Sequence, residues 1–246
     1  MKKNNPLFPQ NIHPSWDGLL SSKFCEKIGD ISAVLEQEKL VNGYRFLPEP
    51  DKVMRFLELD ADRIQCVILG MDPYPSFYTD TDRVKKPVAT GRSFEVANAD
   101  SWNQRFKQSS LRNILKTVYF NSTGKMPTLT EIREEIAEKS FPISPPHEWF
   151  ENLEQQGVLF LNATLTVAPG SPDGHSDLWE NAMNDIIRYI NKKTCPKWLL
   201  FGNKAQERVM SIIGDDENLF CCHHPRLSVF VEEDIFDRVP EIRWVC

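Results

Sequence analysis

The sequence CVILG at residues 66–70 is a short apolar run that does not alternate with polar residues. A strand with both faces buried has this pattern, whereas a half-exposed strand alternates apolar and polar side chains. Three later runs share it: GVLFLN at 157–162, WLLFG at 198–202 and NLFCC at 218–222. Because helical patterns separate the runs, we predict an α/β fold with three layers (αβα). Helices should flank a central, mostly parallel four-stranded sheet.

Helical periodicity is clearest in SDLWENAMNDIIRYINKK, residues 176–193, where apolar side chains recur along one face. We expect Asp177 and Glu180 to form a capping box at its start. Before the first apolar run, we predict two further helices, over residues 22–37 and 51–59.

The length and the amino-terminal sequence limit the organisation of the chain. The 246 residues suffice for one α/β domain, so we predict a single domain over residues 1–246. Residues 1–15 are polar and contain proline, and we expect a loosely ordered lead-in there. They lack the apolar stretch of a signal peptide, and no run is long enough to span a membrane. We therefore expect a cytoplasmic protein that does not bind a membrane.

The six cysteines occur without a C-x-x-C pair. Cys66, Cys221 and Cys222 lie in apolar runs, so we expect buried thiols rather than disulfides or metal ligands. Zinc could in principle be held by Cys221, Cys222, His223 and His224. However, adjacent strand residues point to opposite faces, so these four cannot easily converge on one ion. We expect no metal site.

Polar side chains follow each apolar run directly. Asp72 and Tyr74 come after the first run, Asn162 ends the second, and His223 and His224 follow the fourth. In an open α/β sheet, ligands bind outside the carboxyl ends of the strands. We therefore expect these side chains to converge on one crevice. The formal net charge of −6 argues against binding nucleic acid through bulk charge, but it leaves room for a local phosphate site.

Four motifs carry a family resemblance. VILGMDPYP, residues 67–75, resembles the water-activating motif of family 1 uracil-DNA glycosylases, which usually reads GQDPYH. QGVLFLNATLTVAPGSPDGHS (156–176) resembles the uracil-recognition strand and its following loop. WLLFGNKAQ (198–206) resembles LLWGxxAQ, and HHPRLS (223–228) resembles HPSPLS. All four occur in the order and at the spacing of that family.

The resemblance implies a DNA repair enzyme that flips uracil out of DNA and hydrolyses its N-glycosidic bond. It implies no cofactor, and its partner is DNA containing uracil or another damaged base. We expect a monomer. Asp72 resembles the catalytic aspartate, which orients water and stabilises the positive sugar. Asn162 resembles the residue whose amide matches the O4 and N3–H of uracil.

Two aromatic residues and one methionine resemble the rest of the base pocket. Tyr74 resembles the ring that excludes the 5-methyl group of thymine. Phe94 resembles the aromatic residue on which the flipped base stacks. Met71 stands beside the base, where the family usually has glutamine. Core packing is the alternative for both aromatic residues, and helix capping is the alternative for Asp72.

The sequence leaves two histidines open as the residue that stabilises the leaving base. Matching the His-Pro pair selects His224, whereas counting back from Leu-Ser selects His223. We favour His224, which would donate a hydrogen bond to the uracil O2 as negative charge develops there.

Four residues resemble the contacts that this family makes with the DNA strand. Leu227 resembles the wedge that fills the space left by the flipped base. Ser110 resembles the serine of a phosphate loop, and Gly202 and Asn203 resemble a second phosphate-binding loop.

The chain also departs from the family pattern. Pro75 replaces a histidine, and residues 232–234 add three carboxylates after the wedge position. Residues 75–93 form a longer and more charged loop than we expect. These departures leave two alternatives open: a non-catalytic glycosylase-fold protein that binds nucleic acid or protein, and a glycosylase for another deaminated base, such as hypoxanthine or xanthine.

Overall fold

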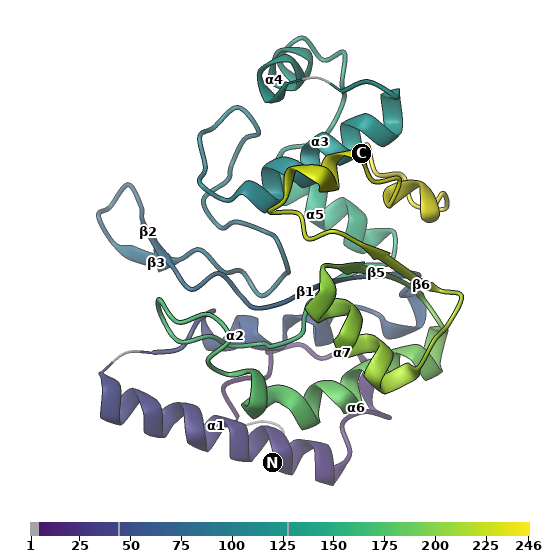
Figure 1. Cartoon of the computed structure of the whole chain (residues 1–246). Coiled ribbons are helices and arrows are strands. Elements are labelled where there is room, and N and C mark those ends of the chain that lie inside the picture. The colour runs from purple at the N-terminus through teal and green to yellow at the C-terminus, as the bar shows by residue number, and fades with distance from the viewer. Residues whose placement is uncertain (1–4, 44, 127) are drawn as a thin grey trace.

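The computed structural model describes residues 5–43, 45–126 and 128–246, and its centre is a sheet of four parallel strands (Figure 1). Helices lie on both faces of this sheet. This confirms the predicted α/β fold of three layers. In spatial order, the strands are β4 (Val158–Asn162), β1 (Cys66–Gly70), β5 (Lys197–Phe201) and β6 (Leu219–Cys222).

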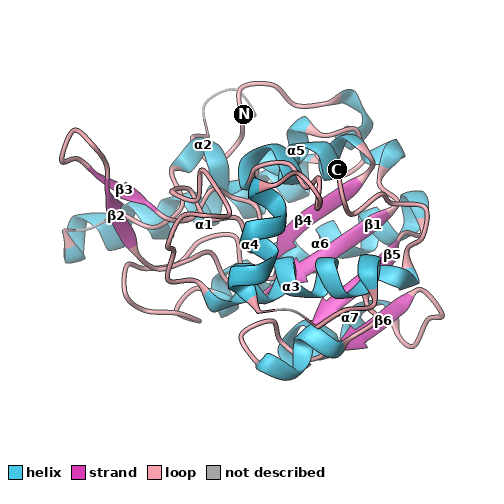
Figure 2. Cartoon of the chain, turned by 90° about the horizontal axis from the view of Figure 1, so that it is seen from above, coloured by secondary structure: helices cyan, strands magenta, loops and turns pink. Residues whose placement is uncertain are grey.

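Alternate residues of the strands enter two separate cores, because successive side chains point to opposite faces. One helical layer contains α1 (Ser22–Asn42), α6 (Ser176–Thr194) and α7 (Asn203–Ile213). The other contains α3 (Ser109–Thr123), α4 (Leu129–Ala137) and α5 (Pro146–Gln155) (Figure 2). Val67 and Leu69 pack with the first layer, whereas Cys66 and Ile68 pack with the second.

The edge strand β6 departs from the expectation of buried strands. Cys66 and Cys222 are buried as predicted, but Cys221 is exposed. No strand of the described sheet lies beyond β6, and its first two residues are only half-buried. The prediction for Cys221 was wrong because an apolar run alone does not distinguish an edge strand from a central one.

Two helix predictions need correction at the level of single residues. The helix predicted over 51–59 is broken at Met54, leaving α2 (Pro50–Val53) and a short 3₁₀ helix, Arg55–Glu58. The capping box predicted for α6 does not form, because its N-cap is His175 and no side chain caps it. The His175 ring instead bonds Thr166 and Glu38, over 2.9 and 3.0 Å. α1 extends beyond the predicted end and stops at Gly43.

The segment before α1 is packed rather than loosely ordered from residue 5 onward. Leu7 has no exposed surface, and Phe8 joins the same core as α1 and α6. The Asn5 amide also donates a hydrogen bond to the Ile28 carbonyl over 3.2 Å. Two apolar side chains in a polar stretch are a weak sequence signal, so the prediction of a loose lead-in was wrong for these residues.

The remaining elements are short. A hairpin of β2 (Phe77–Thr79) and β3 (Lys85–Pro87) is separate from the main sheet. Further 3₁₀ helices span Pro14–Trp16, Ala61–Arg63, Ser228–Glu232 and Phe236–Arg238. Within the described residues, no helix combines the length and the apolar character that crossing a membrane requires.

Candidate active site

A cleft of about 470 Å³ lies at the carboxyl ends of the strands, where the sequence predicts the site. Its walls come from the loops after β1, β5 and β6, together with the loop that precedes α6. Seven predicted residues line it: Met71, Asp72, Gly202, Asn203, His223, His224 and Leu227.

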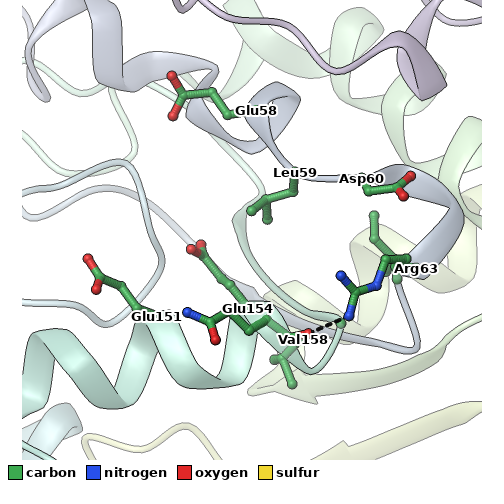
Figure 3. Close-up of a pocket in the computed structure, with 10 residues that line it drawn as sticks. Glu58, Leu59, Asp60, Arg63, Glu151, Glu154 and Val158 are labelled. Atoms are coloured by element: carbon green, nitrogen blue, oxygen red, sulfur yellow. Dashed lines mark hydrogen bonds between the residues drawn. The ribbon is translucent and has the colours of Figure 1, made fainter.

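A second cavity, of about 320 Å³, lies at the opposite edge of the sheet (Figure 3). It opens beside the start of β4, where the Arg63 guanidinium donates to the Gln155 carbonyl over 2.9 Å. The carboxylates of Glu58, Glu151 and Glu154 surround it. None of the predicted site residues lines it, and its carboxylates would repel a phosphate. The cleft at the carboxyl edge is therefore the candidate active site.

The Asp72 carboxylate is partly satisfied inside the cleft. Its Oδ2 accepts a hydrogen bond from the Asp173 amide over 2.9 Å. Its Oδ1 is buried without a hydrogen-bond partner among the residues described. Burial raises the pKa of Asp72, and the nearby Asp173 carboxylate raises it further. One oxygen is thus fixed by the protein, and the other is left for a ligand or water.

Asp173 is itself paired with a cation. The Lys204 ammonium lies 2.7 Å from Asp173 Oδ2 and lowers the pKa of that carboxyl group. Asp173 has a positive φ of 63°, which turns its amide toward Asp72. Sequence reasoning missed both residues. The Pro-Asp-Gly turn at 172–174 was the available signal, because aspartate tolerates a left-handed backbone.

Asn162 ends β4 directly opposite Gly70 of β1. The residue is only 3% exposed and does not line the open cleft, and no residue in the described parts of the chain bonds its amide. A Cβ at position 70 would lie 2.6 Å from Asn162 Oδ1 and 3.4 Å from the Phe94 ring, so glycine alone leaves room for both. The fold leaves this amide without a hydrogen bond of its own at the carboxyl end of β4, beside Gly70 and Phe94, so its donor and acceptor are available to a ligand.

Phe94 lies between the strand ends and the histidine loop. Its ring centroid is 5.4 Å from Phe201 and 6.2 Å from His224, and only 8% of the residue is exposed. Its φ of 64° is unusual for a bulky residue, and such strain concentrates at functional sites. Phe94 does not line the open cleft, but its contacts connect Gly70 to His224.

The two histidines have different surroundings, which the sequence could not distinguish. His224 is half-buried, and its Nδ1 accepts a hydrogen bond from the Arg226 amide over 3.1 Å. Burial lowers the pKa of His224, and the positive Arg226 lowers it further. The neutral ring therefore carries its proton on Nε2 and can donate it. His223 is more exposed, and its Nδ1 contacts the Glu233 carboxylate.

The carboxylates after Leu227 are partly neutralised. Glu233 accepts hydrogen bonds from the ring and from the backbone amide of His223. Asp234 pairs with Arg238 over 2.6 Å. Arg238 thus offsets one of the three carboxylate charges that follow Leu227.

Tyr74 and Ser110 are not among the residues that line the cleft. Tyr74 packs against the core beneath it, and its buried hydroxyl has no partner in the described part of the molecule. Burial raises the pKa of this hydroxyl. Ser110 is 9% exposed in the first turn of α3. The neighbouring Asn113 was missed by sequence reasoning. Its side-chain amide donates to the carbonyls of Pro225 and Leu227, and so it holds the loop that carries Leu227, which we call the wedge loop.

The start of α7 meets the histidine loop at Gly202. This residue has a φ of 90°, and a Cβ there would lie 2.9 Å from the Cβ of His224. The close approach brings the amino terminus of an 11-residue helix to the cleft wall, and such termini favour anions. Leu227, which is 44% exposed, lines the same cleft.

Comparison with known proteins identifies the fold. No family model matches the chain. The crystal structure of wild-type UNG from Nitratifractor salsuginis is similar, with a TM-score of 0.66 and 19% identity, covering 94% of this chain and 92% of that one. The mimivirus uracil-DNA glycosylase structure gives a TM-score of 0.61 at 21% identity, covering 87% and 69%. These structures show that the chain has the glycosylase fold.

Curated relatives carry the identification further. The uracil-DNA glycosylase of Borrelia duttonii is 30% identical over 200 residues, covering 79% of this chain and 75% of the relative. That of Xanthomonas oryzae pv. oryzae (strain PXO99A) is 26% identical over 217 residues, covering 87% and 77%. The chain belongs to the uracil-DNA glycosylase family, and it is an enzyme of the N-glycosylase class of hydrolases.

Proposed function

We propose that this protein removes uracil from DNA by flipping the nucleotide into the cleft and hydrolysing its N-glycosidic bond. The observation that carries the proposal is the Asn162 amide at the carboxyl end of β4, which stands beside Gly70 and Phe94 and has no hydrogen-bond partner among the described residues. An amide offers a donor and an acceptor side by side, which matches the O4 and N3–H of uracil. Cytosine presents the reverse pattern and would leave both groups unpaired.

The other base contacts follow from the same geometry. The Phe94 ring lies between Gly70 and His224 and offers a surface for stacking. His224 presents a neutral Nε2–H, which can donate to the uracil O2 as negative charge moves onto the leaving base. Met71 lines the cleft as an apolar surface, and we assign the exclusion of the thymine methyl group to Tyr74, which packs against the neighbouring core.

Asp72 acts on the sugar side of the bond. Its free Oδ1 orients water, and its negative charge stabilises the cationic sugar that forms when the C1′–N1 bond breaks. The water oxygen bonds to C1′ and gives up a proton to Asp72, while the electron pair of the broken C1′–N1 bond leaves with the base, which later takes up a proton. Asp173 holds the other oxygen in place through its backbone amide.

The cleft wall supplies the DNA contacts. Gly202 and Asn203 at the start of α7 bind a phosphate, and the exposed Leu227 side chain enters the space left by the flipped base. Ser110 contacts a second phosphate from the first turn of α3, one turn before Asn113, which holds the wedge loop.

A panel of oligonucleotides tests this function. Each strand carries one uracil, thymine, cytosine or hypoxanthine, and alkali cleaves the strand wherever a base has been lost. We expect cleavage of the uracil strand only. Cleavage of the hypoxanthine strand alone would assign a different base, and no cleavage at equimolar protein would contradict catalysis.

The charge pair beside Asp72 predicts opposite pH shifts. Lys204→Met leaves the Asp173 charge uncompensated, which further raises the pKa of Asp72 and moves the acid limb of kcat to higher pH. Asp173→Asn removes the like charge, lowers the pKa of Asp72 and moves that limb to lower pH. Asparagine keeps the backbone donor and tolerates the positive φ. Profiles of kcat against pH that shift in the same direction would contradict this coupling.

A further inference from the structure

The hairpin formed by β2 and β3 leaves the body of the protein directly after the Asp72 loop. It pairs with no strand of the main sheet, and both views show it projecting outward (Figures 1 and 2). Its base is fixed where the Pro75 carbonyl accepts from Gly170 over 2.8 Å and the Ser76 carbonyl accepts from Val88 over 3.0 Å. The hairpin is therefore an arm attached to the rim of the cleft.

The two faces of the hairpin differ in character. Phe77 pairs with Pro87 and Thr79 pairs with Lys85, so these four side chains share one face. Tyr78 and Lys86 share the other face and line a cavity against the body of the protein. On the first face, Phe77 is 45% exposed, and Thr79 and Lys85 are exposed beside it. Pro87 of this face also lines the cavity, whereas the side chains of Phe77, Thr79 and Lys85 form no hydrogen bond or ion pair with the described residues.

Two cations of the arm, Arg83 and Lys85, form no ion pair with the described residues, and one further carboxylate, Asp82, lies beside them. Asp80 is held within the turn by the amides of Asp82 and Val84 and by Lys86, whose ammonium lies 2.7 Å away. In the portion of the chain that is described, no ion pair or hydrogen bond involves the side chains of Arg83 or Lys85. Residues 77–87 carry one net positive charge, although the whole chain has a net charge of −6.

The arm lies within reach of DNA bound in the cleft. Phe77 follows Asp72 by five residues, which an extended chain spans in at most about 18 Å. A DNA strand carries one phosphate per roughly 3.4 Å of helix axis, so the arm lies within about five nucleotides of the flipped base.

We propose that the β2–β3 hairpin binds the single-stranded flank of the DNA, with Phe77 stacking on an unpaired base and Arg83 and Lys85 contacting phosphates. An exposed aromatic ring beside cations is the arrangement that binds single strands. A duplex keeps its bases stacked and cannot use the ring. This inference rests on the proposed function, because it extends the same DNA path.

The test measures affinity and release separately. Fluorescence anisotropy with a uracil-free single strand of about 20 nucleotides gives affinity, and that length extends well past the arm. We expect Phe77→Ala to weaken binding to the single strand about fivefold or more. The same substitution should weaken binding to the duplex much less. Arg83→Gln/Lys85→Gln should lower the slope of log affinity against log salt by about 1.4. The matched control is Lys23→Gln/Lys192→Gln, two exposed lysines near the start of α1 and the end of α6, at the opposite edge of the sheet.

The outcomes separate the arm from the catalytic proposal. Uracil release from a strand of about three nucleotides, which is too short to engage the arm fully, tests catalysis alone. Hairpin variants that bind the long single strand as the control variant does would overturn the inference even if uracil is released. Equal losses for single strand and duplex would overturn the assignment to unpaired bases. Wild-type protein that releases no uracil would instead contradict the proposed function.

Discussion

Replacing Asp72 by asparagine is expected to lower kcat for uracil release by about 10²–10⁴-fold, the usual contribution of a positioned acid or base. The amide keeps the size of the side chain and can still accept from the Asp173 backbone. It removes the negative charge that faces the sugar and the free oxygen that orients water. KM should therefore change little, because the loss occurs mainly in the transition state. Single-turnover release of uracil measures the effect.

Asp173→Asn is the matched control for this prediction. It makes the same chemical change in the neighbouring carboxylate, which lies at the cleft but outside the base contacts. At neutral pH it should retain most of the wild-type rate. If Asp72→Asn stayed within tenfold of wild type, or if the two variants lost activity equally, Asp72 would not be the reacting carboxylate.

Asn162→Ala is expected to lower kcat/KM for uracil by about 10²-fold or more, because it removes a donor to an oxygen that gains negative charge as the base leaves. It should also reduce the discrimination between uracil and cytosine, since alanine presents neither pattern of donor and acceptor. Folding should be maintained, because none of the described residues is hydrogen-bonded to this amide. Competition assays with paired uracil and cytosine substrates measure both effects.

Asn184→Ala gives the control for loss of a buried amide. The Asn184 side-chain oxygen is buried without a partner among the described residues, and it lies on α6, outside the cleft. It should leave kcat/KM close to wild type. An equal loss in the two variants would show that the effect of Asn162 is structural rather than a matter of base recognition.

The sequence predicted the sheet well because burial on both faces leaves a direct pattern. CVILG at 66–70 and VLFLN at 158–162 form β1 and β4, and their polar ends lie at the same edge. Cys221 was predicted incorrectly because burial at a sheet edge depends on neighbours that a local pattern does not contain. The capping box of α6 failed for a related reason. The His175 ring bonds Thr166 and Glu38, which come from distant segments.

The site was less predictable than the fold, because its electrostatics depend on contacts between loops. The Lys204–Asp173 pair joins segments that lie 31 residues apart. The choice between His223 and His224 depended on which ring meets Glu233 and which accepts from Arg226. Motif spacing gives the position of a side chain along the chain, but not its hydrogen bonds.

Mass spectrometry of the small molecules released from single-uracil DNA is the most direct measurement. Wild-type protein should liberate one equivalent of the free base for each abasic strand, with the same yield when a chelator is present. DNA recovered with every uracil still attached, after prolonged incubation with excess folded protein, would contradict the proposal that this cleft hydrolyses the bond.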